Sequence, residues 1–332
     1  MPNATPLIVV TGGAGFIGSN IAGDLARRAD VVVCDRFGAD HRWRNIAKHD
    51  MADILAPEQL FDFLDAHVQQ VTAVIHMGAI SATTESDVDL ILDSNFRLSR
   101  DLWRWCGAHA SRLIYASSAA TYGGGECGFS DDDDPRFLAR LKPLNAYGWS
   151  KHLFDRFVAR SLARGENSPR QWAGLKFFNV YGPNEYHKGS MQSVVARIYP
   201  RVAAGKPVKL FRSHRPDYAD GGQQRDFVYV DDCIRVAGWL LDHPTVSGLF
   251  NVGCGQARSF ADLARTVFRA VDREPDITYI DTPLEIRDKY QYFTQAETTK
   301  LRQAGFSEDF TALEAGVTDY VRNYLAGDDP YR

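Results

Sequence analysis

The sequence lacks any apolar run that approaches the ~18 residues of a membrane span, so we expect no membrane-spanning helix. It also lacks a basic N-terminal region followed by a long apolar core, so we expect no secretory signal peptide. Positive charge is not in excess either, because the formal net charge is -4. The chain therefore offers no basic footprint for nucleic acid or for an anionic membrane surface.

Cysteine is scarce and irregularly spaced. The chain has five cysteines, an odd number, and no C-x-x-C pair. This pattern favours free thiols in a reducing cytoplasm over disulfides or a zinc site, so we expect a cytoplasmic protein without bound metal. The remaining composition is that of an ordinary globular protein, with 45% hydrophobic and 24% charged residues. A length of 332 residues suffices for about two domains.

Residues 7–25 carry the most informative pattern in the chain. An apolar run over residues 7–10 is typical of a buried parallel strand, and glycines follow with the spacing Gly12-x-x-Gly15-x-x-Gly18. Apolar residues then recur every four positions, as on one face of a helix. Between a strand and a helix, such glycines let the backbone approach a pyrophosphate at the helix N-terminus. The stretch therefore predicts a dinucleotide site.

A second expected strand, residues 31–34, ends at Asp35. An acid about 20 residues beyond the glycine loop is the usual partner of an adenosine ribose. The two strands, the helix and the acid together favour a dinucleotide-binding unit over a glycine-rich turn in another kind of α/β protein.

Alternating strand and helix patterns continue through the first half. Further strands are expected at residues 71–76, 112–116 and 175–180, with helices at about 93–106 and 145–163. This alternation predicts an α/β protein with a Rossmann-type, doubly wound parallel sheet and a smaller C-terminal substrate-binding domain.

The second half is expected to divide between the two domains. We expect residues 1–178 to form the dinucleotide-binding domain, joined by residues 226–252. Residues 179–225 and 253–328 are expected to form the substrate-binding domain, because helical segments and polar loops replace the regular alternation there.

Tyr147 and Lys151 lie four residues apart in an expected helix, so their side chains share one face. A phenol has an ordinary pKa of about 10, and a nearby ammonium favours its ionised form. Tyr147 is therefore a candidate to take a proton from a hydroxyl as hydride leaves the same carbon. Ser118, at the end of an expected strand, is a candidate partner for the reacting oxygen, and the sequence separates it poorly from Ser117. The alternative for the pair is an ordinary exposed helix face.

These motifs together resemble the extended short-chain dehydrogenase/reductase family, which comprises nucleotide-sugar epimerases, dehydratases and reductases. The resemblance spans nearly the whole chain and rests on the glycine loop, the Ser-Ser-Ala element at 117–119 and the Tyr147–Lys151 pair. Narrower motifs resemble a branch that epimerises ADP-linked heptoses at C6. These motifs are Phe178-Asn-Val-Tyr-Gly-Pro183, His187-Lys-Gly-Ser-Met191, Arg225-Asp-Phe-Val-Tyr-Val230 and Phe293-Thr-Gln-Ala296.

The resemblance implies a cofactor that is used and restored within one turnover. Bound NADP+ would take hydride from C6 of the sugar, the transient ketone would turn in the site, and hydride would return to the opposite face. Two faces imply two proton-handling groups, and the resemblance assigns these roles to Tyr147 and Lys188. Ser118 would assist, and Lys151 would also hold the nicotinamide ribose. An alternative role for Lys188 is to bind phosphate or sugar without moving a proton.

The resemblance also assigns the residues that contact the two ligands. Arg36 and Arg42 favour NADP over NAD, because guanidinium binds a phosphate with two hydrogen bonds; NAD remains an alternative. The expected cofactor contacts are Gly12, Gly15, Phe16, Ile17, Gly18, Asp35, Arg36, Arg42, Met77, Gly78, Ala79, Ile80, Ser81, Asn95, Lys151 and Val180. The expected substrate contacts are Ser118, Asn179, Ser190, Arg197, Phe211, Arg225 and Tyr290, with Arg225 on the diphosphate.

Three other functions compete with this interpretation. A UDP-hexose 4-epimerase would share the cofactor and the Tyr147–Lys151 pair. A dehydratase usually carries an acidic pair just after the active-site hydroxyl residue, where this chain has Ala119-Ala120. A cofactor sensor or scaffold protein on the same fold would tend to lose Tyr147 or Lys151.

Two segments depart from the closest pattern near the expected substrate entrance. They are the four acids at 131–134, which we expect in a solvated loop, and the loop at 218–222. These two departures bear on which sugar nucleotide the chain would bind. The expected partners are a nucleotide-sugar substrate and further copies of the chain in a homo-oligomer.

Overall fold

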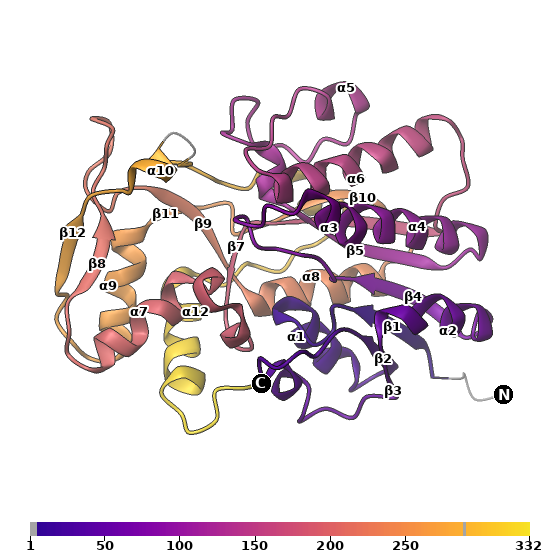
Figure 1. Cartoon of the computed structure of the whole chain (residues 1–332), viewed down its shortest axis with the longest axis horizontal. Helices are drawn as coiled ribbons and strands as arrows, with labels where there is room; N and C mark the ends of the chain where they lie inside the picture. Colours follow the sequence, from indigo (N-terminus) through magenta and orange to yellow (C-terminus); the bar gives the residue numbers. More distant parts are fainter. Residues whose placement is uncertain (1–4, 288–289) are drawn as a thin grey trace.

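A computed structural model describes residues 5–287 and 290–332 of the protein. One part of the molecule, in the right-hand half of Figure 1, is built around a parallel sheet of seven strands. In spatial order the strands are β10 (Gly248–Val252), β6 (Gln171–Phe177), β5 (Arg112–Ser118), β4 (Val71–His76), β1 (Leu7–Thr11), β2 (Asp30–Cys34) and β3 (Asp53–Leu55). The expected Rossmann-type parallel sheet is confirmed. The order reverses between β1 and β4, where ligands of such sheets bind.

Both faces of this sheet are covered, because successive side chains of a strand point to opposite sides. On β1, Val9 packs in one apolar cluster, whereas Ile8 and Val10 pack in another. The helices of the Val9 face are α2 (Leu60–Ala66), α4 (Leu98–Ala108) and α6 (Ala146–Ala163). Those of the other face are α1 (Phe16–Leu25), α8 (Val230–Asp242) and α11 (Thr299–Gln303).

A third apolar cluster lies in the other part of the molecule, at the left of Figure 1. It is formed around two small sheets and three helices. The three-stranded sheet contains β11 (Ala257–Ser259), β9 (Gln224–Tyr229) and β7 (Asn179–Tyr181), and the two-stranded sheet contains β12 (Ile277–Ile280) and β8 (Val208–Phe211). The helices are α7 (Val194–Ala203), α9 (Phe260–Ala270) and α12 (Leu313–Tyr320).

Short helical segments complete the chain. They are η1 (Arg42–Asn45), η2 (Pro57–Gln59), α3 (Val88–Leu92), η3 (Asp93–Arg97), η4 (Ala119–Tyr122), α5 (Pro135–Leu138), η5 (Tyr186–Met191), α10 (Leu284–Arg287) and η6 (Val321–Leu325). Among the described residues, no helix combines the length and the apolar character that crossing a bilayer requires. All five cysteines are free, as expected.

The helix expected at 93–106 begins earlier and is not uniform. It starts as α3 at Val88, passes through the π-helical segment η3, and continues as α4. Asn95, an expected cofactor contact, lies in the π-helical segment and is fully buried. Such π turns often occur at functional sites, because they re-aim one side chain within a helix.

The strand expected at 175–180 is two strands in different sheets. β6 ends at Phe177 in the seven-stranded sheet, and β7 begins at Asn179 in the three-stranded sheet. Residues 226–252, which were expected to join the dinucleotide-binding domain, contribute to two sheets. β10 pairs with β6 in the large sheet, whereas β9 pairs with β7 and β11 in the three-stranded sheet. The division into two domains at the expected boundaries remains a prediction.

The acidic run at 131–134 is a loop, as expected, but only Asp132 and Asp134 in it are exposed. Asp131 is buried and accepts a hydrogen bond from the Asn251 N–H (2.8 Å), and Asp133 pairs with Lys300 (2.8 Å). For Asp131 and Asp133 the expectation of a solvated side chain was wrong, because these two carboxylates accept hydrogen bonds from N–H groups of the edge strand β10. The run is therefore part of the scaffold of the sheet.

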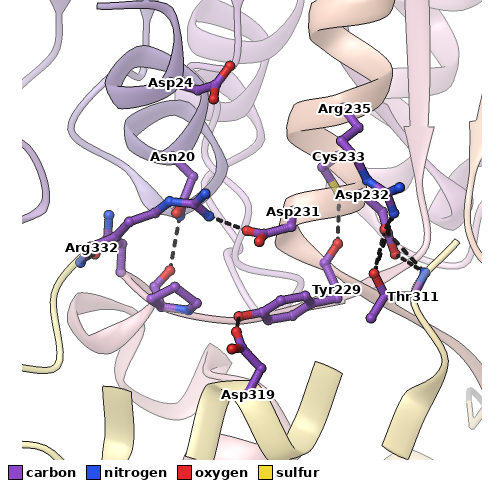
Figure 2. A network of polar contacts seen from close by, with 12 residues as sticks. Asn20, Asp24, Tyr229, Asp231, Asp232, Cys233, Arg235, Thr311, Asp319 and Arg332 are labelled. Carbon is purple, nitrogen blue, oxygen red and sulfur yellow. Dashed lines mark hydrogen bonds and ion pairs between the residues drawn. The ribbon is translucent and has the colours of Figure 1, made fainter. Parts of the chain in front are cut away.

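A polar network joins the first part of the chain to the segment that follows β7 (Figure 2). The Asn20 amide on α1 donates to the carbonyl oxygen of Pro183 (3.0 Å), and Arg332 pairs with Asp231 at the start of α8. Because Pro183 leads into η5, this network fixes the position of the segment that carries Lys188.

We expect Asn20→Ala to lower the free energy of unfolding by about 1–2 kcal/mol, since the substitution removes the donor to a buried carbonyl oxygen. The matched control is Asp24→Ala on the same helix, which removes an exposed pair with Arg27 and is expected to change stability by less than about 0.5 kcal/mol. Urea denaturation measures both. Equal effects of the two substitutions would contradict the role of Asn20.

Candidate active site

The glycine loop brings the ends of β1 and β4 into backbone contact. Gly12 has a φ of +66°, and a Cβ atom there would lie 2.5 Å from the Gly78 Cα atom. A Cβ atom on Gly18 would lie 2.1 Å from the Gly12 carbonyl oxygen, so only glycine fits at both positions. α1 begins at Phe16, directly after Gly15, whose N–H donates to the Gly12 carbonyl oxygen (3.0 Å), and no side chain caps the helix. The N–H groups of its first turn fit a pyrophosphate.

Asp35 lies beside the glycine loop at the end of β2. Its carboxylate accepts hydrogen bonds from the N–H groups of Ala14 (2.9 Å) and Arg36 (2.7 Å). Burial raises the pKa of Asp35, and these hydrogen bonds oppose the shift. A pocket of about 490 Å³ opens next to it, of a size that fits a nucleoside. The lining residues are Asp35, Arg36, Phe37, Gly38, Ile54, Leu55 and Ala56.

The two arginines expected at the ribose are already paired with acids. Arg36 pairs with Glu58, and the Arg42 Nε atom lies 2.9 Å from the Asp40 carboxylate. The Arg42 guanidinium lowers the pKa of Asp40 to about 2 and lies 3.9 Å from Asp35. The structure therefore places Arg36 at this pocket and the Arg42 guanidinium near Asp35, which lines the pocket, and the charge of each arginine is partly compensated by an acid.

The segment Met77–Ser81 follows β4 and is held by Asn95. The Ile80 N–H donates to the Asn95 side-chain oxygen (2.8 Å), and the Asn95 amide donates to the Ile80 carbonyl (2.9 Å) and to the Ser150 hydroxyl (3.0 Å). Ser150 lies on α6, one residue before Lys151. Asn95 thus ties the expected nicotinamide segment directly to the helix that carries Tyr147.

Ser118 and Tyr147 are in contact. The Ser118 side chain lies close enough to the Tyr147 phenol to lower its pKa, and it accepts a hydrogen bond from the Ala120 N–H (3.1 Å). Ser117 donates instead to the buried Asp155 carboxylate (2.7 Å). The two serines that the sequence left open therefore have different partners, and Ser118 is the one beside the tyrosine.

Burial governs the titration of the tyrosine–lysine pair. It raises the pKa of Tyr147, and the nearby Ser118 side chain opposes that shift. It lowers the pKa of Lys151 to about 8, and the Asp155 carboxylate opposes that shift. The expectation that the protein holds the pKa of Tyr147 below its ordinary value is wrong here, because desolvation of the phenolate is the larger effect.

Lys188 lies in η5, close to the start of α1. Its Nζ atom is 5.3 Å from the centroid of the Phe16 ring. Burial lowers the pKa of Lys188, opposed by the Glu185 carboxylate. Glu185 is itself fully buried and accepts a hydrogen bond from the Ser193 hydroxyl (2.7 Å), which holds η5 in place. The lysine is therefore fixed beside the glycine loop.

Three of the expected substrate contacts form one cluster in the second part of the chain. The Arg225 guanidinium is 5.6 Å from the Tyr290 ring centroid, and the rings of Tyr290 and Phe211 pack edge to face at 6.1 Å. Arg225 is 8% exposed. Among the described residues, no hydrogen bond or ion pair links this cluster to the exposed side chains of Asn179, Ser190 and Arg197.

Sequence reasoning missed two buried groups near these residues. His76 at the end of β4 shares hydrogen bonds with Thr11 (2.6 Å) and Ser99 (2.8 Å), and burial lowers its pKa to about 3, so it stays neutral. The other is the ion pair of Asp155 with Lys176 (2.6 Å), both fully buried. Asp155 lies one helical turn beyond Lys151, and that i, i+4 spacing was the available signal.

Comparison with known proteins gives a consistent family assignment. The family model described as the NAD dependent epimerase/dehydratase family matches residues 8–253. The chain is 51% identical over 330 residues to the ADP-L-glycero-D-manno-heptose-6-epimerase of Nitratidesulfovibrio vulgaris, covering 98% of this chain and 100% of that protein.

Solved structures agree with the observed fold. The Helicobacter pylori ADP-L-glycero-D-manno-heptose-6-epimerase superposes with a TM-score of 0.78 at 29% identity, over 96% of each chain. The Thermus thermophilus UDP-glucose 4-epimerase, solved in complex with NAD, gives a TM-score of 0.70 at 24% identity, over 95% of this chain and 99% of that one. The second likeness is one of fold.

We expect Gly18→Ala to weaken dinucleotide binding at least about tenfold and to lower stability by about 1–3 kcal/mol, because the new Cβ atom forces the Gly12 carbonyl to move. Fluorescence titration with the reduced cofactor and thermal unfolding measure the two effects. The control is Gly238→Ala on α8, where the Cβ atom meets only the flexible Arg28 side chain at 3.4 Å. Unchanged affinity in Gly18→Ala would contradict the close-approach argument.

Proposed function

The chain belongs to the NAD-dependent epimerase/dehydratase family, and we propose that it inverts C6 of ADP-D-glycero-β-D-manno-heptose to give the ADP-L-glycero epimer. The observation that carries the proposal is the 51% identity to a heptose 6-epimerase over essentially its whole length. The motifs around Lys188 and at residues 293–296 support the same substrate. The product is a precursor of the lipopolysaccharide inner core.

We propose NADP as the resident cofactor, with NAD as the alternative. The free N–H groups at the start of α1 and the close backbone approach at Gly12 fit the pyrophosphate. Asp35 would hold the adenosine ribose, and Arg36 and Arg42 would exchange part of their pairing with acids for a 2′-phosphate. Lys151 would hold the nicotinamide ribose. When bound, the nicotinamide accepts a hydride from the sugar carbon and returns one to it.

The remaining expected cofactor contacts are proposed on the same grounds. Phe16 and Ile17 would flank the pyrophosphate, and Val180 would lie on the nicotinamide side with Met77, Gly78, Ala79, Ile80 and Ser81. Asn95 would hold that segment through its bonds to Ile80.

We assign proton transfer at the C6 oxygen to Tyr147 and Lys188. Burial moves their pKa values in opposite directions, because it disfavours the phenolate and the ammonium alike. An amine that releases its proton more readily is suited to accept the hydroxyl proton, and a phenol that keeps its proton is suited to donate it to the ketone oxygen. The two roles exchange when the reaction runs backwards, and Ser118 orients the oxygen beside Tyr147.

The second part of the chain would hold the nucleotide. We propose that Arg225 binds the ADP diphosphate, because its buried guanidinium is held between the rings of Tyr290 and Phe260. Phe211 and Tyr290 would contact the nucleoside. Asn179, Ser190 and Arg197 would contact the sugar and phosphates. We further propose that the protein acts as a homo-oligomer in the cytoplasm, with the two domains expected from the sequence.

We expect the protein to convert ADP-D-glycero-D-manno-heptose at C6, followed by NMR, without added cofactor. Tyr147→Phe and Lys188→Ala are each expected to slow conversion by about 10²–10⁴-fold while cofactor stays bound, because each removes one proton-transfer group. Lys206→Ala, an exposed lysine, is the control. Conversion of a UDP-hexose instead would assign the 4-epimerase activity, and wild-type rates in the double variant would refute the two-group mechanism.

We expect Arg42→Ala to weaken NADP binding by about 10–100-fold and to leave NAD binding nearly unchanged, because only NADP carries the 2′-phosphate that the guanidinium would bind. Isothermal titration of cofactor-stripped protein with both nucleotides measures this. Arg104→Ala, exposed on α4, is the control. Equal losses for NADP and NAD would assign Arg42 to the ribose pocket in general and not to the phosphate.

A further inference from the structure

A buried ion pair lies directly behind the candidate catalytic residues. The Lys176 Nζ atom on β6 is 2.6 Å from the Asp155 carboxylate on α6, and both side chains are 0% exposed. The same carboxylate accepts hydrogen bonds from the Ser117 hydroxyl (2.7 Å) and the Tyr115 phenol (3.2 Å). The carboxylate therefore accepts hydrogen bonds from three donors.

Lys176 is equally well satisfied. Its ammonium donates to the Thr121 hydroxyl (2.9 Å) and lies 4.9 Å from the centroid of the Tyr122 ring. The three hydrogen bonds that the Asp155 carboxylate accepts stabilise its ionised form. The acceptor and the aromatic face beside Lys176 stabilise the ammonium. A buried ion pair of this kind contributes little net stability compared with apolar residues, so its presence calls for a functional explanation.

The pair is connected to Ser118 through short contacts. Lys176 lies beside Ser117 in the β5–β6 register, and Thr121, which accepts from Lys176, donates to the Ser118 carbonyl oxygen (2.8 Å). The pair therefore holds both the residue before Ser118 and the turn after it.

The pair is also connected to the helix that carries Tyr147. Asp155 follows Lys151 by one helical turn and Tyr147 by two. At the other end of this helix face, α6 packs tightly on η4, since a Cβ atom on Gly148 would lie 2.7 Å from the Ala120 carbonyl oxygen. Four elements, β5, η4, α6 and β6, thus meet at one ion pair.

We propose that Asp155 and Lys176 are positioning residues for the reaction described above: the pair fixes Ser118 against Tyr147, and its balanced charge sets the electric field at Lys151 and Tyr147. The proposal rests on the proposed function for what Tyr147 and Lys151 do. It adds two residues that would touch neither substrate nor cofactor. Removing the negative charge of Asp155 should therefore lower the proton affinity of Lys151. Removing the positive charge of Lys176 should raise it.

Other charged and titratable groups around Lys151 do not provide this balance. His76 on β4 stays neutral, and so does the Tyr115 phenol on β5, whose pKa burial raises. On η4, burial likewise raises the pKa of Tyr122. On α6 itself, burial lowers the pKa of His152 to about 4, and Arg156 is exposed. Further groups on the packed elements are Asp93 and Arg97 of η3, Asp89 of α3, Arg136 of α5 and Asp101 and Arg104 of α4, all of which are exposed or paired at the surface.

The test measures the pKa of Lys151 directly, from the pH dependence of its side-chain resonance in protein labelled with ¹³C-lysine and assigned with Lys151→Arg. We expect Asp155→Asn to lower this pKa by about one pH unit and Lys176→Met to raise it by about as much. The double variant Asp155→Asn/Lys176→Met should return it close to the wild-type value of about 8. The pH profile of kcat should move in the same directions, with little change in KM.

Matched controls separate a local field from a general loss of charge. Asp242→Asn and Lys48→Met each break an exposed ion pair elsewhere, with Arg28 and Asp329, and are expected to leave the pKa of Lys151 unchanged. Lys176→Arg keeps the charge and is expected to keep both the pKa and the rate. If Asp155→Asn does not fold, Lys176→Met against Lys176→Arg still gives the predicted rise and its rescue.

The outcomes distinguish this proposal from the proposed function. Opposite shifts in the two single variants support the pair, whether or not the wild-type protein converts the heptose. Shifts in the same direction, or lower melting temperatures with no shift, would show a purely structural pair and overturn the proposal even if epimerisation is observed.

Discussion

The close backbone approach of Gly12 and Gly78 is the constraint on which the rest of the site depends. It brings the carboxyl ends of β1 and β4 together at the point where the strand order reverses, which is where ligands of such sheets bind. The proposed reacting groups lie on segments around this point. Ser118 ends β5, Tyr147 lies on the helix packed against the turn after β5, and Lys188 lies over the start of α1.

Burial then gives these groups their chemical character. Removing water disfavours any charged form, so the same environment makes Tyr147 a weaker acid and Lys188 a weaker base than either is in water. An epimerase needs one proton-transfer group on each face of its sugar. Two groups with similar proton affinities meet that need, because each can donate a proton in one direction of the reaction and accept it in the other. The proposed Asp155–Lys176 pair would keep this balance, because it adds hydrogen bonds behind the site without adding net charge.

Much of the fold could be predicted, because each feature depends on neighbours in sequence. Apolar runs predicted the strands, and the spacing of Gly12 and Gly18 predicted the loop between the first strand and the first helix. The break of the strand at Phe178 could not be predicted, since residues that favour strands continue on both sides of Phe178 while the chain changes sheet. The buried acid Asp131 was misjudged because its partner lies 120 residues away.

For the candidate site, residue types were predictable and their environment was not. The tyrosine–lysine spacing predicts a shared helix face, but only the packing shows that burial raises the pKa of Tyr147. Asp155 and Lys176 each look ordinary in the sequence, and they pair across 21 residues only because α6 lies against β6. The roles of the predicted site residues remain predictions.

The proposed inversion requires that hydride leave the sugar carbon and return to it within one turnover. The most direct measurement uses substrate deuterated at C6, in ordinary water and without added cofactor. We expect the product to keep its deuterium at C6 with inverted configuration, because hydride never exchanges with solvent. Loss of deuterium to water would show that the carbon is deprotonated instead, and would contradict the proposed function.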